Sequence, residues 1–182
     1  MYSFVDKNDP VLTKKIDKID KLTKKQKKHL QEMKKVLEET PKAAAISANQ
    51  LGITDVRAFV CRNHDDILAI INPRITWSST DNPEEIIQSN DGVVPKSLPM
   101  WEGCISFPGN NYLVTRPYAI KAEYMNEKEV YKSVTLTDQW ARLFCHEIDH
   151  LDGIRIEDRA EEIIELDEES SNASFLPTSK NT

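Results

Sequence analysis

The segment His146-Glu147-Ile148-Asp149-His150 constrains this chain more than any other feature. On an α-helix each residue advances by about 100°, so four steps bring the second imidazole to within about 40° of the first. Both rings can then reach one metal ion. Glu147 lies about 100° from His146, which suits a general base that hydrogen-bonds a water near the ion. The segment predicts a metal-binding helix, although a bare H-E-x-x-H also occurs by chance as two ordinary histidines.

The flanking residues have the pattern of a capped, amphipathic helix. Thr137 is suited to the N-cap position, and Asp138 places a negative charge at the positive end of the helix. Gly153 is the expected stop. Apolar residues recur at three- and four-residue steps at Trp140, Leu143, Phe144, Ile148 and Leu151. We therefore expect a central helix over 137–152.

A catalytic ion of this kind needs a third protein ligand and an open position for water. Cys145 points about 100° from His146 and about 140° from His150, so we expect it in the core instead. The third histidine of metzincin proteases would fall six residues after His150, where this chain has Ile156. The metzincin class is therefore excluded.

Two kinds of third ligand remain. Cys104 is one, because a thiolate next to a divalent cation loses its proton and binds firmly. Gly103 permits a sharp backbone course before it, and Glu102 could hold neighbouring groups. The other kind is a downstream glutamate, as in thermolysin-like zinc proteases, although this acidic segment is typical of solvated charge. The candidates are Glu157, Glu161, Glu162 and Glu165.

Composition limits the remaining possibilities. A chain of 182 residues favours one domain, and no apolar run approaches the ~20 residues of a membrane span. Nothing resembles a secretory signal, so we expect a cytoplasmic protein. The net charge of −6 argues against a nucleic-acid partner. The lysines of 14–35 alternate with apolar residues at helical spacing. This pattern predicts an amphipathic helix over 23–40, with the lysines on its solvent-exposed face.

Short β-branched and aromatic runs predict strands at 56–61, 67–71, 75–77, 112–115, 119–124 and 130–136. We expect Asn72-Pro73 to close the second strand and 78–99 to be a surface excursion. The predicted fold is α+β: antiparallel β-sheets around the central metal-binding helix, with the N-terminal amphipathic helix outside. We expect one catalytic domain over 1–159. Residues 160–182 form an acidic, polar tail, predicted to be largely disordered, with one short helix at 160–166.

Three separated segments resemble the peptide deformylase family. Glu102-Gly103-Cys104-Ile105-Ser106 is similar to its E-G-C-L-S segment, and 146–153 to its H-E-x-D-H-L-x-G helix. Residues 43–50, ending in Gln50, look like a degenerate form of its first motif, G-φ-G-φ-A-A-x-Q. Asn72-Pro73 falls where the family has I-N-P. The resemblance covers roughly 9–159.

The resemblance implies removal of the formyl group from the N-terminal methionine of new polypeptides, with release of formate. Cys104, His146 and His150 would bind Fe²⁺, although such ligands also accept Zn²⁺, Ni²⁺ or Co²⁺. Glu147 would move the proton, while Gln50 and the backbone N–H of Ile105 would stabilise the oxyanion. The family pattern also implies that Ala45, Gly103 and Leu143 contact the N-formylmethionyl peptide. A transient contact with the ribosome is a further expectation.

The chain departs from the family pattern at several positions. Alanines Ala43 and Ala45 replace both glycines of the first motif, and Ser47 replaces one of its alanines. Asn111 stands where an arginine is expected, and Arg142 occupies a helix position that is usually apolar. These changes concern the peptide site more than the metal site. Two rival functions therefore stay open: a zinc endopeptidase with a glutamate ligand, and a non-catalytic member that binds peptide N-termini.

Overall fold

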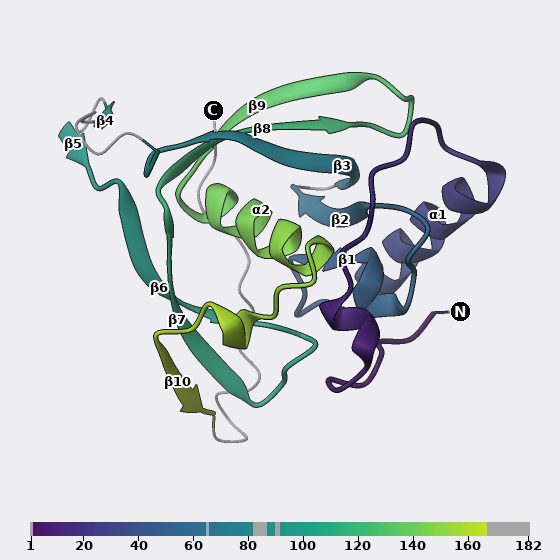
Figure 1. Ribbon diagram of the computed structural model, residues 1–182, viewed down its shortest axis with the longest axis horizontal. Coiled ribbons are helices and arrows are strands. Elements are labelled where there is room, and N and C mark those ends of the chain that lie inside the picture. Colours follow the sequence, from purple (N-terminus) through teal and green to yellow (C-terminus); the bar gives the residue numbers. More distant parts are fainter. Residues whose placement is uncertain (1, 65, 82–86, 90–91, 167–182) are drawn as a thin grey trace.

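The computed structural model of this chain describes residues 2–64, 66–81, 87–89 and 92–166. The fold is α+β, as the sequence predicts. Figure 1 shows helix α2 (Asp138–Leu151) at the centre, with one sheet above it and a smaller sheet beside and below it. The two sheets therefore cover different faces of the helix that carries both histidines.

The larger sheet has five antiparallel strands in the order β1-β2-β3-β8-β9. The smaller sheet has the antiparallel order β10-β7-β6. The strands of the larger sheet are β1 (Ala45–Ser47), β2 (Ala58–Asn63), β3 (Asp66–Ser78), β8 (Ala119–Met125) and β9 (Tyr131–Thr137). Those of the smaller sheet are β6 (Ser97–Gly103), β7 (Asn110–Pro117) and β10 (Glu162–Glu165).

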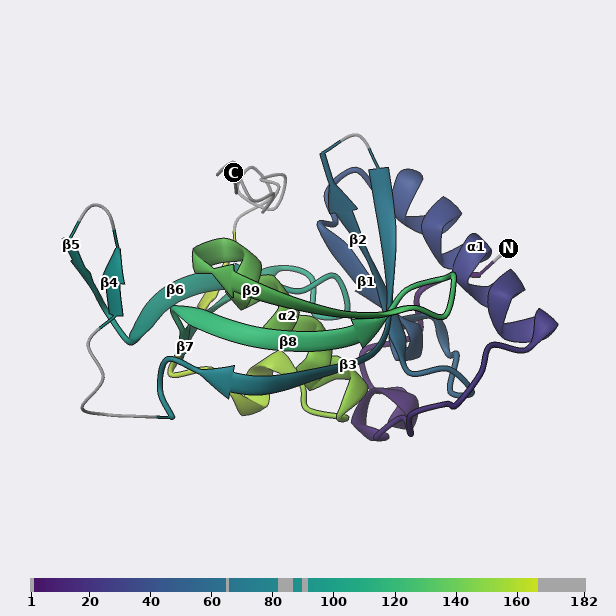
Figure 2. The same cartoon turned by 90° about the horizontal axis from the view of Figure 1, so that it is seen from above.

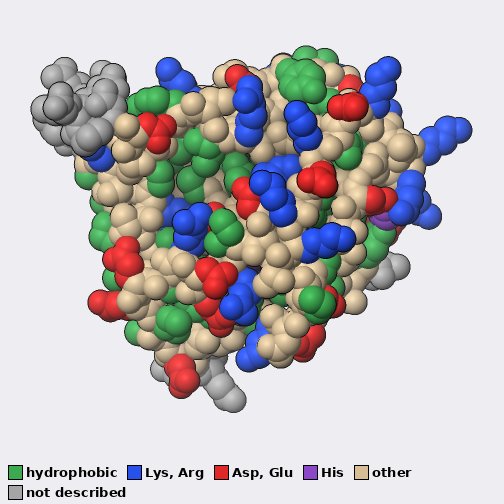
Figure 3. All heavy atoms as spheres, viewed as in Figure 1, with side chains coloured by type: hydrophobic (Ala, Val, Ile, Leu, Met, Phe, Trp, Pro, Cys, Tyr) green, Lys and Arg blue, Asp and Glu red, His purple; other side chains and the backbone are tan. Residues whose placement is uncertain are grey.

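Helix α1 (Lys24–Glu38) confirms the predicted N-terminal helix. Thr23 and Gln26 form a capping box, in which each side chain accepts a hydrogen bond from the other residue's backbone N–H. The apolar stripe of Leu30, Met33 and Leu37 is buried against the larger sheet. Figure 3 shows Lys and Arg side chains, in blue, projecting from the right edge of the molecule, where α1 lies in Figure 1, with acidic side chains between them.

Gly153 ends α2 as predicted, since it follows the C-cap residue Asp152 with a φ of +73°. A second constraint also applies there. A Cβ atom at Gly153 would lie 2.5 Å from the backbone oxygen of Thr13, which no ordinary side chain tolerates. The N-terminal segment therefore packs directly against the end of the metal-bearing helix.

The prediction that Asn72-Pro73 closes a strand is wrong, because β3 runs through both residues. The irregularity is absorbed locally: Asn72 has a φ of +52°, and the register with β8 shifts between Ile71 and Arg74. The Asn72 side chain both donates to and accepts from the backbone of Ile19. The Asn-Pro pair thus anchors the N-terminal segment and does not end the strand.

The segment 78–99, predicted as a surface excursion, contains the two-stranded hairpin of β4 (Ile87–Ser89) and β5 (Gly92–Val94) and then enters β6. Figures 1 and 2 both show this hairpin projecting away from the body of the molecule. The short helix predicted at 160–166 is wrong, because β10 forms there and pairs with β7. The predicted disorder of the remaining tail lies outside the described residues.

Within the described residues, three short 3-10 helices connect these elements: η1 (Pro10–Thr13), η2 (Ala48–Leu51) and η3 (Ile156–Asp158). Helix η2 follows β1 directly, so Gln50 lies one turn beyond the edge of the larger sheet. Among the described residues, no helix has both the length and the apolar character needed to span a bilayer.

Candidate metal centre

Three candidate ligands converge from two elements. The ligand atoms of Cys104, His146 and His150 all lie within 4.8 Å of one another. Cys104 follows β6 directly, and its Sγ is 3.2 Å from His150 Nε2. The two imidazole rings, one helical turn apart on α2, have centroids 4.9 Å apart. One sulfur and two imidazole nitrogens at this separation suit a single small cation with an open coordination position.

The charges of the three groups also fit a cation. Burial opposes ionisation of Cys104, but the field of His150 and a hydrogen bond with His146 outweigh it and lower the thiol pKa to about 6. Burial disfavours the charged form of His146, yet hydrogen bonds with Cys104 and Glu102 raise its pKa well above the ordinary value. The site therefore stabilises a thiolate, which is the form that binds metal.

Glu102 holds the first histidine in place. Its Oε2 lies 2.9 Å from His146 Nδ1, and because a carboxylate only accepts, Nδ1 must donate and Nε2 is left facing Cys104. Arg116 donates to both carboxylate oxygens, and Arg142 donates to Oε1 at 2.5 Å. Burial alone would raise the pKa of Glu102, but the hydrogen bonds of His146 and Arg116 keep it far below its usual range.

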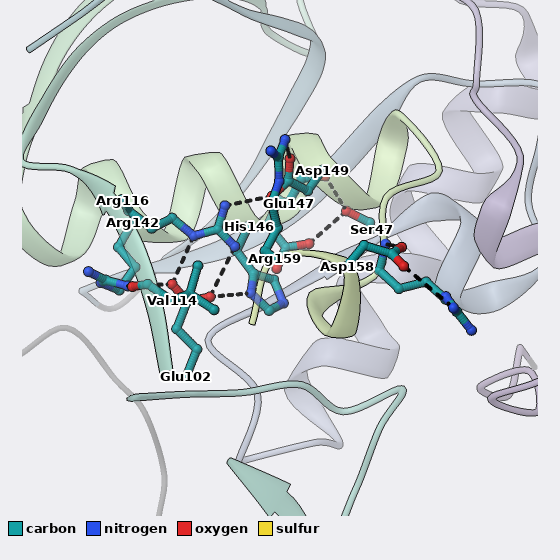
Figure 4. A network of polar contacts seen from close by, with 11 residues as sticks. Ser47, Glu102, Val114, Arg116, Arg142, His146, Glu147, Asp149, Asp158 and Arg159 are labelled. Atoms are coloured by element: carbon teal, nitrogen blue, oxygen red, sulfur yellow. Dashed lines mark hydrogen bonds and ion pairs between the residues drawn. The ribbon is translucent and has the colours of Figure 1, made fainter. Parts of the chain in front are cut away.

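The network continues along α2. Arg116 also donates to Asp149 at 2.6 Å, and the half-exposed Arg159 donates to the same carboxylate at 2.9 Å. Figure 4 shows these groups as one chain of contacts running from β6 and β7 across the helix. The pKa of Arg116 is raised, because the two carboxylates outweigh the effect of its burial. His146 is thus oriented by a buried network of ions.

Glu147 lies on the other side of the two histidine ligands from this ion network. Its side chain is buried, and its Oε2 accepts a hydrogen bond from Ser47 at 2.6 Å. Gln50 accepts from the backbone N–H of Ser47 through Oε1 at 2.8 Å. Its Nε2 therefore faces the candidate centre, donating to Ser106 Oγ at 2.9 Å and lying 3.8 Å from Cys104 Sγ. A base and an amide donor thus flank the three ligands.

A pocket of about 540 Å³ opens beside these groups. It is lined by every residue that the resemblance assigns to the site except His150, which is buried. The lining comes from the segment around β1, from β6 and β7, and from one face of α2. The candidates among it are Ala45, Gln50, Gly103, Cys104, Ile105, Leu143, His146 and Glu147.

Four of the five residues that depart from the family pattern line the same pocket: Ala43, Ala45, Asn111 and Arg142. The fifth, Ser47, is buried and is not part of the lining. The Arg142 guanidinium is turned away into the ion network, where it also donates to the backbone oxygens of Val114 and Leu98. Asn111 Oδ1 is buried and has no hydrogen-bond partner among the described residues.

The rejected and rival ligands lie elsewhere. Cys145 is buried in the main core, as predicted, and burial raises its thiol pKa to about 11. The side chains of Glu157, Glu161, Glu162 and Glu165 are exposed. Within the described part of the chain, the one group of three or more potential ligands close enough to share an ion is Cys104, His146 and His150.

Sequence reasoning did not identify the hydrogen-bonding roles of Ser47, Ser106, Arg116 and Asp149. The sequence did give a reason to consider Asp149, because this carboxylate residue lies within the histidine motif. The Ser47 contact had none, because β1 and α2 are 100 residues apart in sequence and only the fold brings them together.

The α+β fold brings Cys104 next to the two histidines of the H-E-x-x-H helix, which defines the chain as a protein with a candidate Cys/His/His metal site. The sequence pattern of the family described as polypeptide deformylase matches residues 1–165. The chain is 32% identical to a peptide deformylase of Natranaerobius thermophilus over 161 residues, which are 88% of this chain and 93% of that protein. It therefore belongs to the peptide deformylase family, whose members are enzymes.

Further relatives agree. Peptide deformylase 2 of Clostridium acetobutylicum is 32% identical over 158 residues, covering 86% of this chain and 93% of that protein. The crystal structure of peptide deformylase from Thermotoga maritima superposes with a TM-score of 0.74 at 31% identity, covering 89% of this chain and 99% of that chain. The similarity thus extends over nearly the whole described fold and is not confined to the histidine motif.

Proposed function

We propose that this protein is a metal-dependent hydrolase that removes the formyl group from N-terminal formylmethionine of nascent polypeptides and releases formate. The observation that carries the proposal is the convergence of Cys104, His146 and His150 within 4.8 Å, with Glu147 and Gln50 beside them in one pocket. Family membership supplies the reaction and the substrate.

The three ligands would hold Fe²⁺, or Zn²⁺, Ni²⁺ or Co²⁺ in the purified protein. Such an ion supplies Lewis acidity at the formyl group and lowers the pKa of water. Cys104 and His150 are buried, the thiolate of Cys104 is favoured, and the Glu102 contact leaves His146 Nε2 facing Cys104. All three observations support this assignment. Glu102, Arg116 and Arg142 keep His146 in the required tautomer.

Glu147 is the proton carrier of the proposed reaction. Its Oε2 is occupied by Ser47, which leaves Oε1 to take a proton from water and return it to the leaving amine. Gln50 Nε2 and the backbone N–H of Ile105 donate to the oxyanion that forms at the formyl carbon. Ala45 and Gly103 contact the peptide backbone, and the methionine side chain packs against Leu143 and the aliphatic stem of Arg142.

The zinc endopeptidase alternative is less well supported, because its downstream glutamates are exposed and none belongs to the candidate ligand group. Cys104→Ala distinguishes the two functions. In a deformylase this variant loses metal and activity, whereas in an endopeptidase with a glutamate ligand its metal content is unchanged. Metal analysis of the purified variant, with the wild type prepared in parallel, measures the difference.

The activity itself is tested by formate release from formyl-Met-Ala, with protein prepared anaerobically and loaded separately with Fe²⁺, Ni²⁺ or Co²⁺. We expect turnover that is abolished in Glu147→Ala while metal content is retained. Absence of formate with all three metals would contradict the proposal. Peptide binding without turnover in a metal-loaded sample would indicate a non-catalytic N-terminal peptide-binding protein. Ribosome contact and a cytoplasmic location remain predictions from sequence.

A further inference from the structure

Ser47 places a hydroxyl beside the proposed base. The residue ends β1, and its side chain is completely buried. Its Oγ lies 2.6 Å from Glu147 Oε2 and 3.1 Å from the Glu147 backbone oxygen. Both contacts are drawn in Figure 4, where Ser47 points across to the helix. The family motif has an alanine at this position, so the hydroxyl is a feature of this chain's own sequence.

The hydroxyl has one proton and two possible acceptors. The backbone oxygen of Glu147 lies within α2, where the regular i→i+4 ladder already gives it a donor. The carboxylate oxygen is closer and charged, and a hydroxyl bonds a carboxylate more strongly than a neutral carbonyl. Ser47 therefore donates to Glu147 Oε2, and this is the hydrogen bond to that carboxylate found among the described residues.

The same residue also fixes the amide donor. The backbone N–H of Ser47 donates to Gln50 Oε1 at 2.8 Å, which directs Nε2 toward Ser106 and Cys104. The backbone contact is available to any residue at position 47, whereas the contact to Glu147 requires a hydroxyl. Ser47 thus links the two groups that flank the ligands, and only one of its two links depends on the side chain.

We propose that Ser47 is a positioning residue for Glu147: its hydroxyl holds Oε2 and so keeps Oε1 turned toward the substrate. The inference rests on the proposed function and deepens it. Ser47 gives up no proton in this role, because Oε1 gains and loses the transferred proton while Oε2 keeps its hydrogen bond. Without the hydroxyl, the buried carboxylate can rotate, and fewer molecules have Oε1 in the reactive orientation.

The variant Ser47→Ala tests the inference, and the family's alanine at this position indicates that the fold accepts it. A hydroxyl bonded to a charged carboxylate holds that carboxylate in one arrangement, so we expect kcat for formyl-Met-Ala to fall about tenfold. KM should stay within about twofold and metal content should be unchanged, because neither the pocket wall nor the ligands are altered. Gln50 keeps its backbone partner.

Ser79→Ala is the matched control. Ser79 is also a buried serine, and it donates to the backbone oxygen of Lys96 and accepts from the backbone N–H of Ala119, away from the pocket. This variant loses stability but should retain the wild-type kcat. If Ser79→Ala lowers kcat as much as Ser47→Ala, loss of a buried hydroxyl and not the position of Glu147 explains the effect, and the inference is wrong.

A crystal structure of Ser47→Ala gives a readout that does not depend on activity. We expect the Glu147 carboxylate to adopt more than one rotamer in the variant and a single one in the wild type. An unchanged single rotamer, an unchanged or higher kcat in an active enzyme, or a loss of metal would each overturn the inference. Absence of formate release by the wild type would instead contradict the proposed function, and the rotamer comparison would still decide the role of Ser47.

Discussion

The two faces of α2 are held by different kinds of interaction. Ala141, Phe144, Cys145 and Leu151 belong to the main apolar core, which also includes the buried residues of the five-stranded sheet. Arg142, His146 and Asp149 belong to the buried ion network that joins the helix to β6 and β7. Figure 1 shows the helix lying between these two regions.

One face contributes to stability in small increments, and the other determines the geometry of the site. A substitution in the apolar face lowers the free energy of unfolding in proportion to the contacts and volume that it removes, because each contact is weak and non-directional. A buried ion network fixes distances and angles, and removal of one member leaves an unpaired buried charge. The ion network therefore orients the ligands of the candidate centre, and the apolar core fixes their position.

Arg116→Met should give the largest effect, because Arg116 bridges Glu102 and Asp149 inside the network. Breaking a buried pair by removing one partner costs about 3–5 kcal/mol, so we expect the unfolding equilibrium to shift roughly a thousandfold. The free energy of unfolding of the metal-free protein in urea measures this. Arg159→Met is the control: Arg159 binds the same Asp149 from a half-exposed position and should cost far less. An equal loss in both variants would contradict the division between the two faces.

The reactivities of Cys104 and Cys145 allow the ion network and the apolar core to be compared without a mutation. In metal-free protein at pH 7, Cys104 with its pKa of about 6 is mostly thiolate, whereas Cys145 with its pKa of about 11 is almost entirely thiol. After allowing for the higher intrinsic reactivity of the less acidic thiol, we expect iodoacetamide to modify Cys104 about a hundredfold faster. The Cys104 rate should rise with pH and level off above about 6. Peptide mapping by mass spectrometry measures both rates, and modification of Cys145 at a similar rate would show that the network does not stabilise the thiolate.

Phe144→Leu perturbs the apolar face alone. Phe144 packs edge-to-face on Phe59, with ring centroids 5.1 Å apart, and has no contact with the ion network among the interactions described. We expect a loss of about 1–1.5 kcal/mol, or roughly tenfold in the unfolding equilibrium, from the aromatic pair. Metal content and formate release should be unchanged. A loss of metal in this variant would mean that the apolar face also sets the ligand geometry.

The sequence predicted those features of α2 that are encoded within one continuous segment. Helical periodicity identified α2, its N-terminal start, its glycine stop and the two histidines, because all of these are encoded within one segment. Cys145 was assigned to the core from its angle on the helix, and its burial confirms this.

What the sequence could not supply was pairing between distant segments. Arg142 looked like an anomaly beside an apolar pocket, since nothing in the sequence places Glu102, Val114 and Leu98 around its guanidinium. The β10 segment was predicted as a short helix, whereas pairing with the free edge of β7 decides its conformation. Partners made available by tertiary structure outweighed local preference in both cases.

The smallest effect should come from an ion pair outside both faces. Arg74 on β3 donates twice to Glu123 Oε2 on β8, at 3.1 and 2.6 Å, whereas Arg116 donates to both oxygens of Glu102. The two pairs also differ in exposure: the Arg74 side chain is 69% exposed and that of Arg116 is 6% exposed. Water already solvates both Arg74 and Glu123, so Arg74→Ala leaves no buried charge and should cost less than about 1 kcal/mol, diminishing further at high salt. Urea unfolding at low and high ionic strength measures this. A cost as large as that of Arg116→Met would mean that burial does not determine the strength of the network beneath the candidate metal centre.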